Sequence, residues 1–331
     1  MNKKQQSIAA FVQQQNAAKL LFTAGPAALL AENITGLRPC FGRGDDDYAA
    51  VESRVMNALQ KMSGHANMVR MQGSASLGLE IMVLNFLFGR VLVVHSGYYA
   101  QRLAGLAHSA LRRLQQVKEV QVVEWDQLAC LDGQFDWVVA CATETSYGLK
   151  LPIEMLRAIA DRLSARLMLD ATASMGLEPR HELADVMTYS ASKGLFGLTG
   201  AAFVAYHEAP TVEVDSFYLS MTSHLGKMMT GPYHAIASLD EVLPKHETFR
   251  AAVLENKAVF TKRMAEHLSW PTENQPLLCT HVRCKITAKD KRAILYTPRS
   301  DLGGSVVCHL GEIHLGRAAR GDILAVLNSE E

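Results

Sequence analysis

The sequence predicts an α/β fold with a mostly parallel sheet covered by helices, followed by a small α+β domain. Three observations predict it. Short apolar runs typical of strands alternate with helical patterns up to about residue 206, and this alternation ends after residue 245. Small polar residues also follow directly after the apolar runs. Alternating strands and helices form parallel sheets with both faces covered. Ligands bind such sheets beyond the carboxyl ends of the strands.

The order of the elements follows from the hydrophobic pattern. Residues 1–20 form an N-terminal arm, a large domain spans 21–245, and a small C-terminal domain spans 246–331. In the large domain, helices are expected over 49–62, 77–88, from about 98 to 116, and over 153–164, and strands over 91–97, 120–125, 135–144, 166–174, 185–192 and 201–206. In the small domain, helices are expected over 248–268 and 320–328, and strands near 278–287, 292–297, 304–309 and 312–316.

Composition favours a soluble enzyme that acts on small molecules. Hydrophobic residues make up 49% of the chain and charged residues 20%, as in ordinary globular proteins. Lys+Arg and Asp+Glu both total 33, so the basic excess that nucleic acids and acidic membranes require is missing. No signal peptide or apolar run long enough to span a membrane is visible, which predicts a cytoplasmic protein. The six cysteines form no CxxC pair, so reduced thiols are favoured over a metal site.

Asp170 and Lys193 are the strongest candidates for chemistry. Each follows a buried strand, and two strands that end at one crevice can direct a carboxylate and an amine at one molecule. Pyridoxal 5′-phosphate (PLP) uses a lysine as its covalent tether and an acidic residue to keep its pyridine nitrogen protonated. Taken singly, Asp170 fits a helix cap and Lys193 a solvated surface position equally well.

Gly73-Ser74-Ala75-Ser76, before the predicted helix 77–88, is a candidate phosphate site. Free amide groups and the dipole at a helix start favour an anion, and the serine hydroxyls add donors. A serine cap without a ligand explains the same residues. The glycine patterns of dinucleotide, nucleoside-triphosphate and GxSxG hydrolase sites are missing from the sequence.

These motifs resemble the class V aminotransferases, which are PLP enzymes of fold type I. The likeness covers most of residues 21–245 and rests on LFTAGP, QGSASLGLE, SGYYAQR, ATETSYG, DATASMG and SASKG. It implies the fold-type-I architecture, with a mostly parallel sheet of seven strands.

The resemblance also implies a role for each matching residue. Lys193 would form the Schiff base and Asp170 would face the pyridine nitrogen. Tyr99 and Thr172 would cover the two faces of the cofactor ring, and Thr145 would lie at its edge. The implied phosphate contacts are Ser74, Ala75, Ser76 and Ser192.

Within class V, TGPYHAIASLDEVL and ATETSYGLKLPI most resemble 2-aminoethylphosphonate–pyruvate transaminases. That likeness implies a homodimer with shared active sites, in which Thr230 reaches the phosphate of the neighbouring subunit's cofactor, with Lys227 as a second candidate.

The family's C-terminal arginine, which precedes an apolar residue and a glycine, holds the acid group of the substrate. In EIHLGRAAR, His314 stands in its place. Arg317 or Arg320 could replace the arginine, or Arg38 and Arg43 could hold the acid group from elsewhere.

We therefore expect a transaminase that takes an amino group from 2-aminoethylphosphonate or a similar small amine and gives it to pyruvate. Two alternatives remain at this stage. The first is another class V enzyme, such as an alanine/serine–glyoxylate transaminase or a lyase. The second is a non-catalytic protein of the PLP fold.

Overall fold

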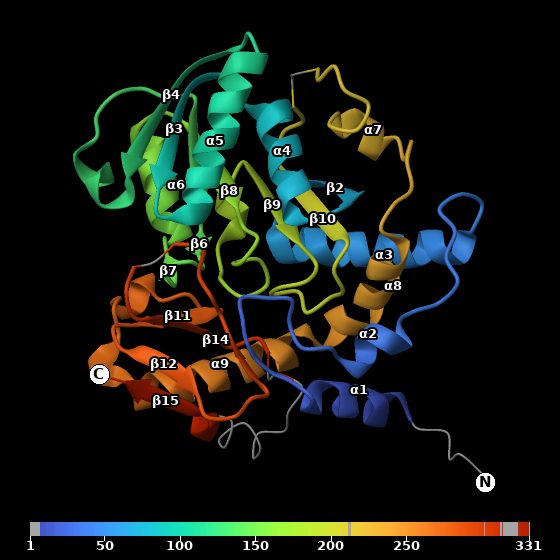
Figure 1. The fold of residues 1–331 in the computed structure, drawn as a ribbon. Coiled ribbons are helices and arrows are strands. Elements are labelled where there is room, and N and C mark those ends of the chain that lie inside the picture. The colour runs from blue at the N-terminus through green and yellow to red at the C-terminus, as the bar shows by residue number, and fades with distance from the viewer. Residues whose placement is uncertain (1–6, 211–212, 301, 312, 314–323, 331) are drawn as a thin grey trace.

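The computed structural model describes residues 7–210, 213–300, 302–311, 313 and 324–330. Its centre is a seven-stranded sheet in the order β2-β10-β9-β8-β5-β3-β4 (Figure 1). β10 is antiparallel to both its neighbours, and the pairs β9–β8, β8–β5, β5–β3 and β3–β4 are parallel. The strands are β2 (Asn67–Gln72), β3 (Gly89–His95), β4 (Val117–Glu124), β5 (Trp137–Cys141), β8 (Arg166–Asp170), β9 (Val186–Ser190) and β10 (Ala201–Tyr206). The predicted sheet is confirmed. β2, which the sequence analysis did not predict, is one of its two edge strands, opposite β4.

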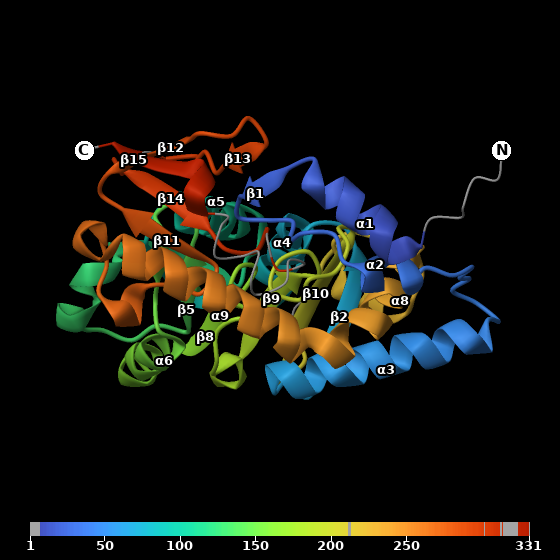
Figure 2. The same cartoon turned by 90° about the horizontal axis from the view of Figure 1, so that it is seen from below.

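Helices cover both faces of this sheet. α4 (Ala75–Phe86) and α5 (Tyr98–Arg113) pack on one face, where alternate strand residues such as Val91, Val93 and Val139 belong to one apolar cluster. The intervening residues, such as Leu92 and Val138, belong to a second cluster with α3 (Asp46–Ser63), α6 (Ile153–Arg162) and α8 (Tyr233–Val242). Figure 2 shows α3 and α6 on the side of the sheet opposite α4 and α5. Strands buried on both faces explain the uninterrupted apolar runs in the sequence.

Local signals determine where α3 and α4 lie. The Asp45 side chain accepts a hydrogen bond from the Tyr48 amide and so caps the start of α3. Gly64, at φ 74°, ends the helix in the left-handed conformation that suits glycine. In α4, a Cβ atom on Gly78 would lie 2.2 Å from Thr188 Oγ1. The missing side chain therefore lets α4 lie close against β9, which holds the helix start at the edge of the sheet.

The C-terminal part begins with α9 (His246–Arg263) and continues in two-stranded sheets. β11 (Cys279–Val282) pairs with β14 (Ser305–Cys308), and β12 (Lys285–Ala288) pairs with β15 (Leu327–Glu330). β13 (Ala293–Leu295) pairs in parallel with β1 (Leu20–Phe22), which follows α1 (Ile8–Ala17). The predicted boundary at residue 245 remains a prediction, but β1 ties the N-terminal segment to the C-terminal part.

Two expectations for this part are wrong. The predicted strand 278–287 is divided into β11 and β12. Within the predicted helix 320–328, residues Leu324–Val326 form a 3₁₀ turn and β15 starts at Leu327. Pairing with β12 buries Leu327 and gives the backbone N–H and C=O groups at the edge of β12 hydrogen-bond partners. A helix at 327–330 would leave those groups without partners from this segment. The predicted strand 312–316 lies outside the described residues, apart from Ile313.

Among the described residues, no helix combines the length and apolar character needed to cross a membrane. The cytoplasmic location stays a prediction.

Candidate active site

A cavity of ≈ 230 Å³ lies beyond the carboxyl ends of β5, β8 and β9. Its lining includes nine of the residues singled out in the sequence, namely Ser74, Ala75, Ser76, Tyr99, Thr145, Asp170, Thr172, Ser192 and Lys193. Five residues that the sequence analysis did not select complete it, namely Arg102, Cys141, Thr143, Ala173 and Ser190. The structure therefore brings the predicted motifs together at one site.

One wall of the cavity is the start of α4. Ser74 is the residue before the first turn, and its hydroxyl makes no capping hydrogen bond. The first amide groups of a helix have no partner within the helix, so those of Ala75 and Ser76 can serve a ligand. Ser190 and Ser192, at the end of β9, present hydroxyls 3.5 Å apart to the same cavity. Hydroxyl and amide donors around a helix start suit a phosphate group.

Asp170 lies at the floor of the cavity and is 2% exposed. Its Oδ1 accepts hydrogen bonds from the Thr172 amide at 3.0 Å and from the Thr172 hydroxyl. Its Oδ2 lies 3.4 Å from Nη2 of Arg102. Two donors from Thr172 and the guanidinium of Arg102 therefore surround the carboxyl group of Asp170.

Arg102 connects the carboxylate to the helix start. Its Nη1 donates to the Ser76 hydroxyl at 3.1 Å, and its guanidinium lies 5.0 Å from the centre of the Tyr99 ring. The sequence contains a signal for this residue, because Arg102 follows Tyr99 by three positions in a helix, a spacing that places two side chains on one face.

Lys193 enters the cavity from the loop after β9. Its Nζ lies 5.9 Å from the centre of the Tyr99 ring. A Cβ atom on Gly25 would lie only 3.0 Å from Cγ of Lys193, and Gly25 has φ 131°. Glycine at this position lets the segment after β1 pack directly on the lysine side chain.

Glu144 holds the aromatic wall of the cavity. It is fully buried at the end of β6 (Thr143–Glu144), and its Oε2 accepts from the amides of Tyr99 at 2.8 Å and Ala100 at 3.2 Å. Its Oε1 accepts from the Ser146 hydroxyl at 2.5 Å. Burial raises the pKa of Glu144, while these hydrogen bonds oppose the shift. The carboxylate thus caps α5 and fixes the position from which Tyr98 and Tyr99 project.

One polar group at the cavity has no partner. The hydroxyl of Thr143, which lines the cavity, is buried without a hydrogen bond among the described residues. Buried polar atoms are normally satisfied, so this hydroxyl is suited to a polar ligand in the cavity. The neighbouring thiol of Cys141 stays protonated, because burial raises its pKa well above the usual value.

Two of the described residues that the sequence analysis predicted for the site, Thr230 and Arg43, do not line this cavity. Thr230 is exposed just before α8, and Arg43 is exposed in the loop between α2 (Ala31–Thr35) and α3. His314 and Arg317 lie outside the described residues.

Two further candidates are held by acidic partners. Arg38 lies 3.8 Å from Asp240 and 3.7 Å from Glu241. Lys227 Nζ lies 2.6 Å from Glu52.

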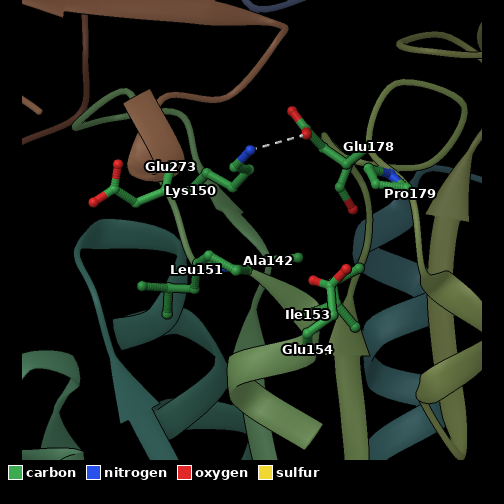
Figure 3. A pocket seen from close by; sticks show the side chains of 10 residues that line it. Ala142, Lys150, Leu151, Ile153, Glu154, Glu178, Pro179 and Glu273 are labelled. Carbon is green, nitrogen blue, oxygen red and sulfur yellow. Dashed lines mark hydrogen bonds and ion pairs between the residues drawn. The ribbon is translucent and has the colours of Figure 1, made fainter. Parts of the chain in front are cut away.

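A second cavity, of ≈ 200 Å³, lies where β7 (Leu149–Lys150) and the start of α6 meet the loop after β8. Lys150 Nζ pairs with Glu178 across it at 3.4 Å, and the carboxylates of Glu154 and Glu273 lie on separate sides (Figure 3). Glu178 also accepts from the Leu277 amide at 2.6 Å, so it joins this loop to the C-terminal part. We assign this cavity a structural role at that junction.

No known family model matches the chain. A 2-aminoethylphosphonate–pyruvate transaminase of Pseudomonas aeruginosa is 26% identical over 254 residues, which cover 70% of this chain and 68% of that protein.

Two solved structures show the same fold. The alanine–glyoxylate aminotransferase of Nostoc sp. has a TM-score of 0.76 at 17% identity, over 92% of this chain and 95% of that one. The pyridoxamine–pyruvate aminotransferase of Mesorhizobium loti has a TM-score of 0.75 at 20% identity, over 93% and 90% of the two chains. The predicted fold, the resemblance to these transaminases and the assignment as an aminotransferase are confirmed.

Proposed function

We propose that this aminotransferase binds PLP in the cavity around Asp170 and Lys193, and that it transfers the amino group of 2-aminoethylphosphonate or a similar small amine to pyruvate. The observation that carries the proposal is the convergence of a buried carboxylate, a lysine amine and a helix start on one cavity of ≈ 230 Å³. The likeness to the Pseudomonas transaminase supports the choice of substrates.

The residues of the cavity fit the cofactor. The phosphate would lie against Ser74, Ala75, Ser76 and Ser192, with Arg102 at its side. Asp170 would face the ring nitrogen, and Tyr99 and Thr172 would flank the ring. The buried hydroxyl of Thr143, which has no partner among the described residues, would meet a polar group of the cofactor, and Thr145 would lie at the edge of the ring. When bound, PLP supplies a carbonyl that accepts amines and a protonated ring that withdraws electrons from the neighbouring carbon.

The chain itself supplies proton transfer and positioning. The amine of Lys193, once the substrate amine had taken its place, would remove the proton from the amino-bearing carbon of the substrate and hold it for return. Asp170, held in place by Thr172 and Arg102, would accept a hydrogen bond from the protonated ring nitrogen. The segment that carries Gly25 packs on Lys193 and limits the access of water to it.

We also propose a homodimer with shared active sites. Large apolar side chains that are exposed in one chain lie in the segments around α7 (Met221–Leu225) and in the loop before α3, namely Phe41, Phe217, Tyr218, Leu225 and Met228. The Tyr218 hydroxyl lies 3.4 Å from the Gln72 carbonyl oxygen, beside the helix start at Ser74. Thr230 is exposed and follows these segments. If a second chain covered the exposed apolar side chains, Thr230 would lie near the active site of that second chain.

Two measurements test the function. Purified protein loaded with PLP should form alanine from pyruvate when 2-aminoethylphosphonate is supplied. A lyase would instead consume the amine without pyruvate, and a non-catalytic protein would form no product. Borohydride reduction should fix the cofactor to the peptide that contains Lys193, and a label on any other lysine contradicts the assignment. A fully active monomer in light scattering would contradict the shared site.

A further inference from the structure

The acid group of the proposed substrate needs a cation, and the cations of the cavity itself are already engaged. Among the described residues that line it, the cationic side chains are Lys193 and Arg102. Lys193 is the proposed tether, and Arg102 contacts Asp170 and Ser76. A guanidinium that is free to bind a phosphonate or carboxylate must therefore come from beside the cavity.

His309 is not that cation. Like His314, it precedes a leucine and a glycine in the sequence. It is 4% exposed, its Nε2 lies 2.9 Å from the Thr280 hydroxyl, and its ring lies 5.5 Å from that of Phe260. Burial, together with the charge of Lys257, lowers the pKa of His309 to about 3. The ring is therefore neutral near pH 7 and faces the core of the C-terminal part.

The pairing of β1 with β13 brings a different arginine to the site. The two strands are parallel, with Leu20 opposite Ala293 and Phe22 opposite Leu295, so the chain leaves both in the same direction. After β1, this direction leads to Gly25, which packs on Lys193. After β13, it leads through Tyr296 to Arg299, whose guanidinium lies 5.6 Å from the centre of the Tyr98 ring.

Successive side chains connect Arg299 to the cavity. The ring centres of Tyr98 and Tyr99 are 5.3 Å apart, and Lys193 Nζ lies 5.9 Å from that of Tyr99. The Tyr98 hydroxyl, followed by that of Tyr99, raises the pKa of Arg299. Arg299 is therefore placed beside the aromatic wall that we assign to the cofactor ring.

The surroundings of Arg299 leave its charge available. It is exposed, and no ion pair joins it to a carboxylate within the described part of the chain. The amides at the start of α5 do not compete for an anion, because Glu144 already accepts from Tyr99 and Ala100. One buried hydroxyl of the same segment, that of Ser300, makes no hydrogen bond among the described residues. The segment thus offers one cation and one polar group.

We propose that Arg299 binds the acid group of the amino donor and so determines the preference for phosphonate or carboxylate substrates. The inference rests on the proposed function, because it assumes that an amine reacts at Lys193. A short substrate would place its amine beside Lys193 and its acid group at the Tyr98 side of the aromatic wall. A planar guanidinium binds two oxygen atoms of such a group at once. Its exposed side chain can rotate from the Tyr98 ring to the ligand.

The test compares an acidic donor with a neutral donor of similar length. Arg299→Gln should lower kcat/KM for 2-aminoethylphosphonate about thirtyfold, which corresponds to ~2 kcal/mol, and leave kcat/KM for n-propylamine unchanged. Arg299→Lys should recover part of the loss, because it keeps the charge but cannot bind two oxygens in the same way. Arg112→Gln, at the exposed far end of α5, makes the same change of charge and should match the wild type.

A binding measurement does not depend on turnover. Calorimetric titration of the PLP-loaded protein with methylphosphonate, in which the proposed phosphate site is filled, should give binding that Arg299→Gln weakens at least tenfold and Arg112→Gln does not. Equal binding and equal kcat/KM in wild type and Arg299→Gln would overturn the inference while the proposed function stands. A wild type that forms no alanine from any amine, yet binds methylphosphonate through Arg299, would instead refute the proposed function.

Discussion

Replacing Asp170 by asparagine removes one negative charge from the floor of the active site and leaves the shape of the side chain almost unchanged. The amide oxygen can still accept from the amide and hydroxyl of Thr172, as Oδ1 does now. The amide nitrogen, however, would present N–H groups to Nη2 of Arg102, where Oδ2 now lies 3.4 Å away. The variant should therefore fold, but its pyridine nitrogen should lose the anion that keeps it protonated.

Two contributions set the size of the effect. A hydrogen bond to a charged group is worth about 1.5–3 kcal/mol. Loss of one preorganised electrostatic partner at a reacting centre typically slows turnover by about 10²–10³. We therefore expect kcat to fall at least about hundredfold, or ~2.7 kcal/mol. Bound cofactor should be retained, because Lys193 and the serine hydroxyls are unchanged.

The assay is alanine formation at saturating 2-aminoethylphosphonate and pyruvate, divided by the cofactor content released in alkali. Asp185→Asn is the matched control, since Asp185 also pairs with an arginine, Arg157 at 2.8 Å, but lies before β9 at the opposite end of the strand from the cavity. It should match the wild type. An Asp170→Asn protein with full cofactor and a rate within tenfold of the wild type would refute the role given to Asp170.

Two predictions concern stability. Glu52→Ala leaves the guanidinium of Arg70, whose side chain is 6% exposed, without its carboxylate, and should lower the free energy of unfolding by roughly 3–5 kcal/mol in urea titrations. Glu119→Ala breaks an exposed pair and should cost less than about 1 kcal/mol, so equal losses would contradict this reasoning. Burial lowers the pKa of both His65 and His181 from 6.5 to about 4, so the unfolded chain binds more protons between these values and stability falls as pH drops below 6.5. Lowering the pH from about 7.5 to about 5.5 should reduce the free energy of unfolding by ~1.3 kcal/mol for each of these histidines. In His65→Gln or His181→Gln, the loss of stability over this pH range should be smaller by that amount.

The sequence was sufficient to predict the sheet and most of the cavity because both depend on local patterns. Strands buried on both faces are continuous apolar runs, and the chain turns at their ends. In a parallel sheet these ends share one edge, so Asp170 at the end of β8 and Lys193 in the loop after β9 had to meet. The same reasoning places Ser74 and Ser76 there, because the helix they begin packs on the sheet.

The errors arose where pairing between distant segments decides the structure. Residues 324–330 contain an apolar stretch that suits a helix, but β12 offers an open edge, so residues 327–330 form a strand. The missed β2 contains Arg70, a residue uncommon in buried strands, and only the partner Glu52 from α3 allows its burial.

By itself, the sequence determined the fold class and singled out Asp170, Lys193 and residues 73–76 as candidates, since each follows from residues close together in the chain. Only the tertiary structure decided which cations reach the site. Arg102 approaches Asp170 because α5 packs on β5, the strand that pairs with β8. Arg299 lies on Tyr98 because β13 pairs with β1, a strand more than 270 residues earlier in the chain. The hydrophobic pattern around either strand does not indicate such a distant pairing. The pairing is stabilised by side-chain packing in the folded protein, which a local pattern does not record.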